Sequence, residues 1–280
     1  MLLGGTVAGS FETPSQWEKM LAASRFKAVT APFSCLTPKE TVDAFCEAAQ
    51  RQQVKIAEVG VWRNLFDPDP VKAEAALHYA KEQLALAEER RIPCCVNIAG
   101  TASPLGWDAA DPGNFTEETY ERIIAVVREI IDEVRPQYAF YCIEPMPWMV
   151  PDSPDAYLQL IRDVDRKQFG AHMDFVNMIN CPRRSLAPEA FVEECFRKLA
   201  PYIKSTHIKD SRMDPRRLTT QIEECAPGEG TLDYAQVLRI MHRYLSPDAP
   251  VLLEHMRTFG EYKKAYDYVA GKAREAGVPV

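Results

Sequence analysis

The chain has 280 residues, of which 46% are hydrophobic and 26% are charged. It is therefore long enough to bury a full core, and neither a disordered segment nor a small disulfide-stapled scaffold fits it. Its 33 Lys and Arg against 40 Asp and Glu leave a net charge of −7, whereas a protein that grips a phosphate backbone is normally basic. We therefore expect no nucleic-acid partner.

The eight cysteines show no CxxC spacing, and five of them lie in apolar or helix-like runs. This pattern favours reduced thiols, which are typical of a cytoplasmic protein. Residues 1–7 are apolar but lack the basic region and the length of a signal peptide, and no window approaches the roughly 18 apolar residues of a membrane helix. We therefore expect a cytoplasmic protein without a membrane partner.

Short apolar runs rich in β-branched residues alternate along the whole chain with longer amphipathic segments, as in α/β proteins. Helix starts are indicated where Thr or Ser precedes Pro or an acidic first turn, at Thr13, Thr37, Thr116 and Ser153. The predicted strands are eight in number and cover residues 2–8, 26–33, 54–61, 92–98, 138–144, 169–175, 203–208 and 251–255.

Eight strand–helix units in a chain of this length predict an α/β fold of the (β/α)8 TIM-barrel type, a single domain over residues 1–280. The competing fold is an open doubly wound sheet, which usually carries a glycine-rich phosphate turn after its first strand. Glycines 4, 5 and 9 do not have that spacing, and no capped helix follows them immediately. The barrel is the better prediction.

Four consecutive predicted strands, the fifth to the eighth, carry a metal-ligand residue type at or near their C-terminal ends: Glu144, Asp174, His207 and Glu254. A barrel builds its active site at these ends, so each strand would aim one side chain at a common point. Oxygen and nitrogen ligands that converge in this way predict a metal site.

The other histidines are sorted by the alternation of side chains along a strand. His172 shares the inward face with Asp174 but lies one pleat lower, so we expect it in the core or supporting the site. His255 should point opposite to Glu254, toward the helix layer. His78 and His242 fall in helix-like segments and should lie on the surface.

Strands five to eight also carry local motifs, and a glycine-containing run follows strand seven at residues 227–234. The motifs are Cys142-Ile-Glu144-Pro145, His172-Met-Asp174, Thr206-His207-Ile208-Lys209-Asp210 and Leu252-Leu253-Glu254. Over its whole length the chain resembles the xylose isomerase-like TIM-barrel superfamily of sugar isomerases and epimerases. The resemblance implies that the four strand-end residues bind one divalent metal ion, and that the pair Glu144 and Glu254 removes and returns a proton.

Three carboxylates and one imidazole form a hard, oxygen-rich site, which favours Mn2+, Mg2+ or Co2+ over Zn2+. A metal there would chelate a hydroxy-carbonyl substrate and stabilise the enediolate that forms when the neighbouring C–H loses its proton. Glu144 and Glu254 would be the catalytic base and acid. In the alternative they are ligands only, and a water molecule or Lys209 moves the proton.

Substrate binding is predicted at residues that follow the strands on the same rim of the barrel. Trp148 would stack on the apolar face of a sugar, and the loop cations, which include Arg183 and Arg184, would hold hydroxyl, carboxylate or phosphate groups. The candidate substrate-binding residues are Glu58, Asn97, Trp148, Asn177, Lys209 and Arg212.

The chain departs from two branches of the superfamily. Ketose 3-epimerases have a histidine where this chain has Asn177 and an arginine where it has Met213, next to Arg212. Endonuclease IV needs further histidines from strands two to four to hold three zinc ions, and this chain offers Asn97 but no histidine there. Assignment to the ketose 3-epimerases is thereby weakened, and DNA repair is disfavoured.

The sequence therefore favours a divalent-metal-dependent isomerase or epimerase of a small sugar, sugar phosphate or hydroxy-keto acid. One alternative is a metal-dependent dehydratase of the inosose or dehydroshikimate type, which forms the same enolate and then expels a β-hydroxyl group. The other is a non-catalytic carbohydrate-binding barrel. The partner is a small carbohydrate or keto acid, and helix faces that carry Trp and Tyr suggest a homo-oligomer.

Overall fold

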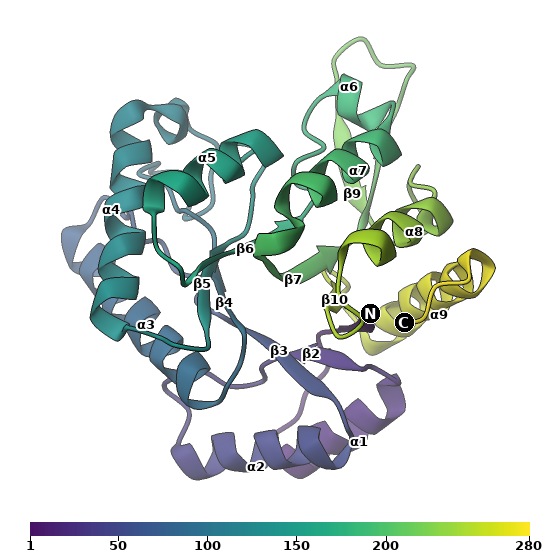
Figure 1. Cartoon of the computed structure of the whole chain (residues 1–280), viewed down its shortest axis with the longest axis horizontal. Coiled ribbons are helices and arrows are strands. Elements are labelled where there is room, and N and C mark those ends of the chain that lie inside the picture. The colour runs from purple at the N-terminus through teal and green to yellow at the C-terminus, as the bar shows by residue number, and fades with distance from the viewer.

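Eight parallel strands close into a barrel in the computed structural model, which describes residues 1–280 (Figure 1). The order around the barrel is β1-β10-β7-β6-β5-β4-β3-β2, so each strand lies beside its successor in the eight-unit series. The barrel strands are β1 (Leu2–Gly5), β2 (Ala28–Thr30), β3 (Lys55–Gly60), β4 (Cys94–Asn97), β5 (Phe140–Ile143), β6 (Phe169–Asp174), β7 (Ile203–Ile208) and β10 (Pro250–Leu253). The eight predicted strands and the single-domain TIM barrel are confirmed.

Helices follow the strands and pack around the outside of the barrel (Figure 1). They are α1 (Pro14–Ser24), α2 (Lys39–Arg51), α3 (Pro70–Glu89), α4 (Glu117–Val134), α5 (Pro154–Val164), α6 (Pro182–Ser185), α7 (Pro188–Leu199), α8 (Tyr234–Tyr244) and α9 (Phe259–Ala276), with short 3-10 turns η1 (Pro112–Phe115) and η2 (Ala200–Tyr202). Thr13, Thr116 and Ser153 cap their helices as predicted, because each side-chain oxygen accepts a backbone N–H of the first turn. Thr37 does not, since α2 begins after Pro38.

One element is absent from the sequence-based prediction. Strands β8 (Asp210–Met213) and β9 (Ile222–Cys225) pair antiparallel outside the barrel, in a segment that we expected to be a loop. Their connection projects beyond α6 in Figure 1. The two strands are short and mostly polar, so they lack the apolar run that reveals a barrel strand.

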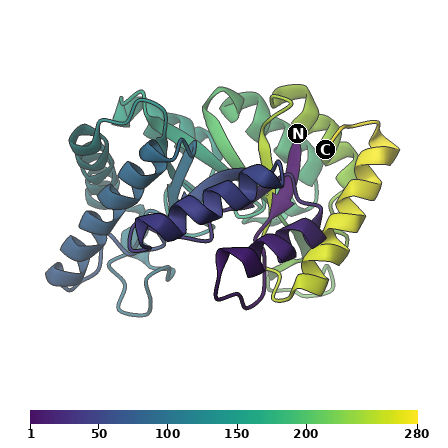
Figure 2. The same ribbon diagram turned by 90° about the horizontal axis from the view of Figure 1, so that it is seen from below.

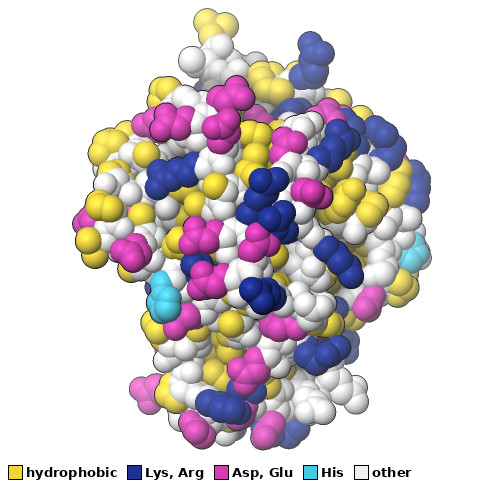
Figure 3. Space-filling model, turned by 60° about the vertical axis from the view of Figure 1, so that its left-hand side comes forward, with side chains coloured by type: hydrophobic (Ala, Val, Ile, Leu, Met, Phe, Trp, Pro, Cys, Tyr) yellow, Lys and Arg dark blue, Asp and Glu magenta, His cyan; other side chains and the backbone are white.

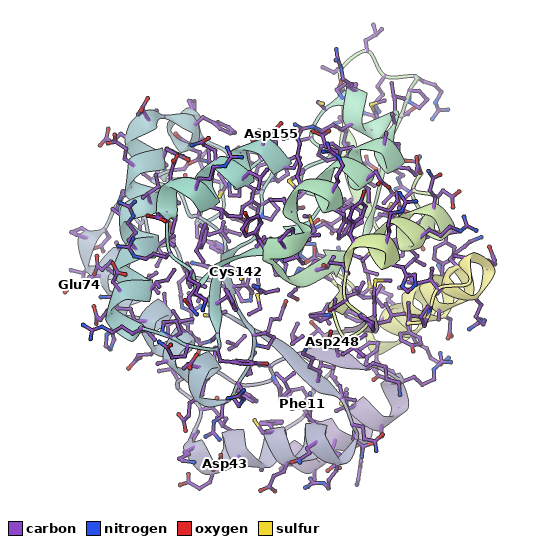
Figure 4. The ribbon with its side chains drawn as sticks, in the orientation of Figure 1. Phe11, Asp43, Glu74, Cys142, Asp155 and Asp248 are labelled. Carbon is purple, nitrogen blue, oxygen red and sulfur yellow. The ribbon has the colours of Figure 1, made fainter.

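The main core consists of 63 buried residues that fill the space between the barrel and its helices. Small side chains fill the lower barrel interior, among them Ala28, Ala57 and Cys142. Figure 4 shows Cys142 in the centre of the molecule, whereas Glu74 and Asp155 lie on the outer helices. All eight cysteines are free thiols.

The two termini lie close together, as Figure 2 shows, and the Met1 amino group donates a hydrogen bond to the Pro279 carbonyl at 3.0 Å. Acidic and basic side chains are interspersed on the face in Figure 3, without a large area of one sign. None of the helices combines the length and the apolar character needed to cross a membrane.

Candidate metal centre

The four strand-end residues meet at one point. Glu144 follows β5, Asp174 ends β6, His207 lies near the end of β7 and Glu254 follows β10. One ligand atom from each lies within 4.8 Å of those of the other three, and all four side chains are buried. The register explains the convergence, since Asp174 pairs with His207 across β6 and β7, and His207 pairs with Leu252 across β7 and β10.

The His207 ring presents one nitrogen to the cluster and the other to the barrel interior. Its Nδ1 lies 3.2 Å from Glu144 Oε1 and 2.8 Å from Glu254 Oε2, while its Nε2 lies 2.8 Å from Glu58 Oε1. Burial lowers the pKa of His207, but Glu254, Glu58 and Glu144 outweigh that effect and raise the pKa well above its usual value. A carboxylate behind a histidine is the arrangement that orients metal-binding imidazoles in proteins.

Glu58 is the residue that orients His207. It lies within β3, is 2% exposed, and also contacts His172 Nε2 at 3.2 Å and Ser205 Oγ at 2.5 Å. Burial raises the pKa of Glu58, but the charges and hydrogen bonds of His207 and His172 lower it below its usual range. Glu58 reaches the cavity from inside the barrel, beneath His207, and His172 is buried as predicted.

Lys209 is held by acidic residues on three sides. Its Nζ lies 2.7 Å from Asp174 Oδ2 and 3.0 Å from Glu224 Oε2, and it also pairs with Glu254. The side chain is 1% exposed, and Tyr234 donates a hydrogen bond to the Lys209 carbonyl at 2.7 Å. Burial lowers the pKa of Lys209, but Asp174 and Glu254 raise it well above its usual value. Lys209 therefore supports two of the four cluster residues from behind.

The glycine-containing run at residues 227–234 wraps the carboxylate of Asp210. The backbone N–H groups of Ser211, Gly228, Gly230 and Leu232 donate to it at 2.8–3.2 Å. A Cβ on Gly230 would lie 2.1 Å from Asp210 Oδ1, so only glycine fits there. The run thus fixes the base of the β8–β9 hairpin, from which Glu224 reaches Lys209.

The prediction for His255 is wrong. We expected this side chain to face the helices, but its backbone has a positive φ of 60°, which breaks the alternation after β10. His255 instead lines the cavity, with Nδ1 2.7 Å from Glu224 Oε1 and Nε2 3.5 Å from Glu254 Oε2. His78 and His242 lie on the surface as predicted.

A cavity of about 1380 Å³ opens above the cluster. Of the predicted substrate-binding residues, Glu58, Trp148 and Asn177 line it. Asn97 is fully buried and instead bonds the backbone of Arg63, and Arg212 points away from the cavity, toward Glu223. Lys209 lies behind the cavity wall.

Sequence reasoning missed several lining residues, among them Trp62, Trp107, Glu224 and Tyr262. The tryptophans lie in loops whose path the strand pattern does not specify. Tyr262 lies in the first turn of α9, and Glu224 lies on the hairpin that was not predicted. Trp62 and Trp107 can be identified as candidate binding residues only because their large aromatic side chains are exposed, and that exposure is known only from the structure.

The cluster fits a divalent cation. Three buried carboxylates lie around one imidazole, and Asp174 is fully buried with Lys209 Nζ 2.7 Å from its Oδ2. Such a donor set matches the oxygen-rich coordination of a hard divalent ion. Glu144, Asp174, His207 and Glu254 would hold the ion, and Glu58 would hold the imidazole.

Comparisons with known proteins agree with this architecture. A protein from Mycobacterium smegmatis, described as a xylose isomerase-like TIM barrel in complex with magnesium, superposes with a TM-score of 0.71 at 16% identity, over 98% of this chain and 97% of the other. A D-psicose 3-epimerase, determined in the presence of D-fructose, has a TM-score of 0.70 at 14% identity and coverage of 99% and 100%. A probable 3-DHS dehydratase from Bacillus anthracis has a TM-score of 0.73 at 13% identity, with 96% and 99% covered.

No curated protein sequence matches the chain. The model of one family, the xylose isomerase-like TIM barrel, matches residues 21–270, which is most of the chain. Together with the closed eight-stranded barrel, this match establishes that the chain belongs to the xylose isomerase-like TIM-barrel family.

Proposed function

We propose that the protein is a divalent-metal-dependent isomerase or epimerase of a small carbohydrate, which acts by proton transfer next to a carbonyl group. The observation that carries the proposal is the buried cluster of Glu144, Asp174, His207 and Glu254 at the floor of a large cavity. Solved structures with the same fold include a D-psicose 3-epimerase and an L-ribulose 3-epimerase, which support this class of reaction.

A divalent cation held by the cluster would supply a Lewis acid that polarises the substrate carbonyl. Glu144 and Glu254 follow β5 and β10, which are separated around the barrel by β6 and β7. They therefore approach a substrate from different sides. One carboxylate removes the proton from the carbon beside the carbonyl, and the other returns a proton to the opposite face.

The surrounding residues hold the two carboxylates in place. Lys209 fixes Glu254 from behind, and the pKa of Glu254, which burial raises, is lowered well below its usual value by Lys209 and His207. Glu144, by contrast, has a single ion-pair partner, His207, whose Nδ1 lies 3.2 Å from Glu144 Oε1. This difference supports Glu144 as the proton acceptor in the proposed reaction, with Glu254 the more strongly ion-paired carboxylate.

The test is exchange of the substrate hydrogen with solvent. In D2O with Mg2+ or Mn2+, NMR should show deuterium at the carbon beside the carbonyl of a ketose substrate, and Glu144→Gln should abolish the exchange. Glu74→Gln, an exposed substitution on α3, is the matched control (Figure 4). Retention of metal without exchange in any ketose or hydroxy-keto acid would contradict the proposal and favour a binding protein.

A dehydratase is the second candidate, favoured by the ion pair of His255 and Glu224 on the cavity wall. An imidazole held by a carboxylate can donate a proton to a departing β-hydroxyl group. A structure of the same fold is a probable 3-DHS dehydratase. Ultraviolet absorbance of a conjugated enone would separate this reaction from epimerisation, and loss of that absorbance in His255→Gln would assign the acid.

A further inference from the structure

We propose that the substrate of this site is an uncharged sugar joined to a second ring, such as a disaccharide or a glycoside, and that sugar phosphates are excluded. This inference rests on the proposed function, because it takes the metal cluster as the place where the reacting sugar binds. It goes further by assigning the remainder of the cavity.

The cavity is larger than one sugar requires. Its volume of about 1380 Å³ exceeds the roughly 300–1,000 Å³ of pockets that enclose a whole drug-sized ligand. The metal cluster occupies one half of the barrel mouth, since Glu144, Asp174, His207 and Glu254 come from β5, β6, β7 and β10. The loops after β3 and β4 lie across the barrel mouth from β7 and β10, and they leave room there for another part of the ligand.

Three of the four tryptophans of the chain line the cavity, two on these opposite loops and one on the loop after β5, beside the cluster. Trp62 follows β3, Trp107 follows β4 and Trp148 follows β5, and all three stay 36–40% exposed. Exposed indoles gathered in one cavity are unusual on a monomer surface, and their flat apolar faces match the C–H face of a sugar ring or an aromatic ring.

Two of these tryptophans are held in place by contacts with the chain. Trp148 Nε1 donates to the Asp108 carbonyl at 2.7 Å, which ties the loop after β5 to the loop after β4. The Trp62 indole lies directly over the backbone of Gly60, where a Cβ would be 1.8 Å from Trp62 Nε1. Trp62 and Trp148 are therefore in place before any ligand arrives, which lowers the entropy lost on binding.

No Lys or Arg lines the cavity, whereas five acidic residues do: Glu58, Asp108, Glu144, Glu224 and Glu254. Of the nearby cationic groups, Lys209 is already paired with Asp174, Glu224 and Glu254, and His255 on the cavity wall is paired with Glu224. A phosphate group would meet like charge here without an arginine or lysine partner. The other lining polar groups are mostly hydroxyls and amides, which suit uncharged sugar hydroxyls.

The backbone anion sites common in barrels are also filled. Phosphate in such folds is often held by N–H groups of the loops after the seventh and eighth strands. After β7 those N–H groups, at Gly228, Gly230 and Leu232, bind the carboxylate of Asp210. After β10, Glu261 caps the start of α9 by accepting from the N–H of Arg257 and Thr258. The chain's own carboxylates occupy both places.

The experiment compares three ketoses that differ only at the oxygen on C6: D-fructose, isomaltulose, which carries a glucosyl group there, and D-fructose 6-phosphate. Binding to the Mg2+-loaded protein is measured by isothermal titration calorimetry, and two further ketose disaccharides, lactulose and turanose, extend the linkage types. We expect at least one disaccharide to bind about tenfold more tightly than fructose. Fructose 6-phosphate should bind more weakly than fructose.

The double variant Trp62→Ala/Trp107→Ala keeps the Trp148–Asp108 bond and should bring disaccharide affinity down to the fructose level, with fructose binding changed less than twofold. Leu105→Ala, at an 83% exposed position in the same loop as Trp107, is the control. The inference is overturned if no disaccharide binds more tightly than fructose, if fructose 6-phosphate binds more tightly than fructose, or if the double variant leaves disaccharide affinity unchanged. Because these are binding measurements, they can succeed where the deuterium exchange fails, and the reverse.

Discussion

Replacement of Glu58 by Gln tests whether this buried carboxylate holds His207 for a metal ion. The substitution keeps the size of the side chain but removes the charge that accepts from His207 Nε2 at 2.8 Å and from His172 Nε2 at 3.2 Å. An amide can still accept one of these hydrogen bonds, but it supplies no negative charge behind the imidazole. The ring then loses both basicity at Nδ1 and part of its fixed orientation.

The expected effect follows from supporting residues in other metal sites. Loss of such a partner weakens metal binding by about 10- to 100-fold, or about 1.4–2.8 kcal/mol. Glu58 is 2% exposed, so solvent screens its charge little, and we expect the upper half of that range. The free energy of unfolding of the metal-free variant should also fall, because a buried hydrogen-bonded charge pair is broken.

Isothermal titration of Mg2+ into the metal-free protein measures the effect directly, and circular dichroism shows whether the variant is folded. The control is Glu74→Gln, an exposed glutamate on α3 with no ion pair. A folded Glu58→Gln variant that binds Mg2+ within twofold of the unsubstituted protein would refute the reasoning, since the carboxylate would then have no role in orienting His207.

Three further results are expected. Asp174→Asn should abolish saturable Mg2+ binding because it removes a charged ligand, whereas the control Asp155→Asn, at the exposed start of α5, should not. Equal metal content in the two variants, measured by elemental analysis, would refute the proposed metal site. Carboxylates around His207 outweigh the effect of burial and raise its pKa, so a proton competes with the metal at this imidazole, and the Kd for Mg2+ should rise as pH falls through neutrality. Calorimetry in buffers of different ionisation enthalpy should detect the proton that metal binding releases. A Kd for Mg2+ that does not change with pH would contradict this reasoning. Thr258→Ala removes the capping box of α9 and should lower the free energy of unfolding by about 1 kcal/mol in urea denaturation, with no change expected in Mg2+ affinity.

The sequence by itself determined the architecture and the residues of the candidate metal cluster. Apolar strand runs and capped helices repeat along the chain, and the barrel geometry brings equivalent strand ends together, so Glu144, Asp174, His207 and Glu254 could be placed from their positions alone. This reasoning works because strand ends in a closed parallel barrel have one common direction, which makes a local pattern predict a long-range contact.

Only the tertiary structure decided what surrounds the cluster. His255 leaves the strand alternation through a positive φ, and Glu224 reaches Lys209 from a hairpin whose polar strands give no periodic signal. Trp62 and Trp107 lie in loops, whose paths depend on packing against neighbouring loops rather than on local sequence. Strand periodicity fixes the direction of a side chain only while the backbone stays regular, and the cavity of this protein is built largely where that regularity ends.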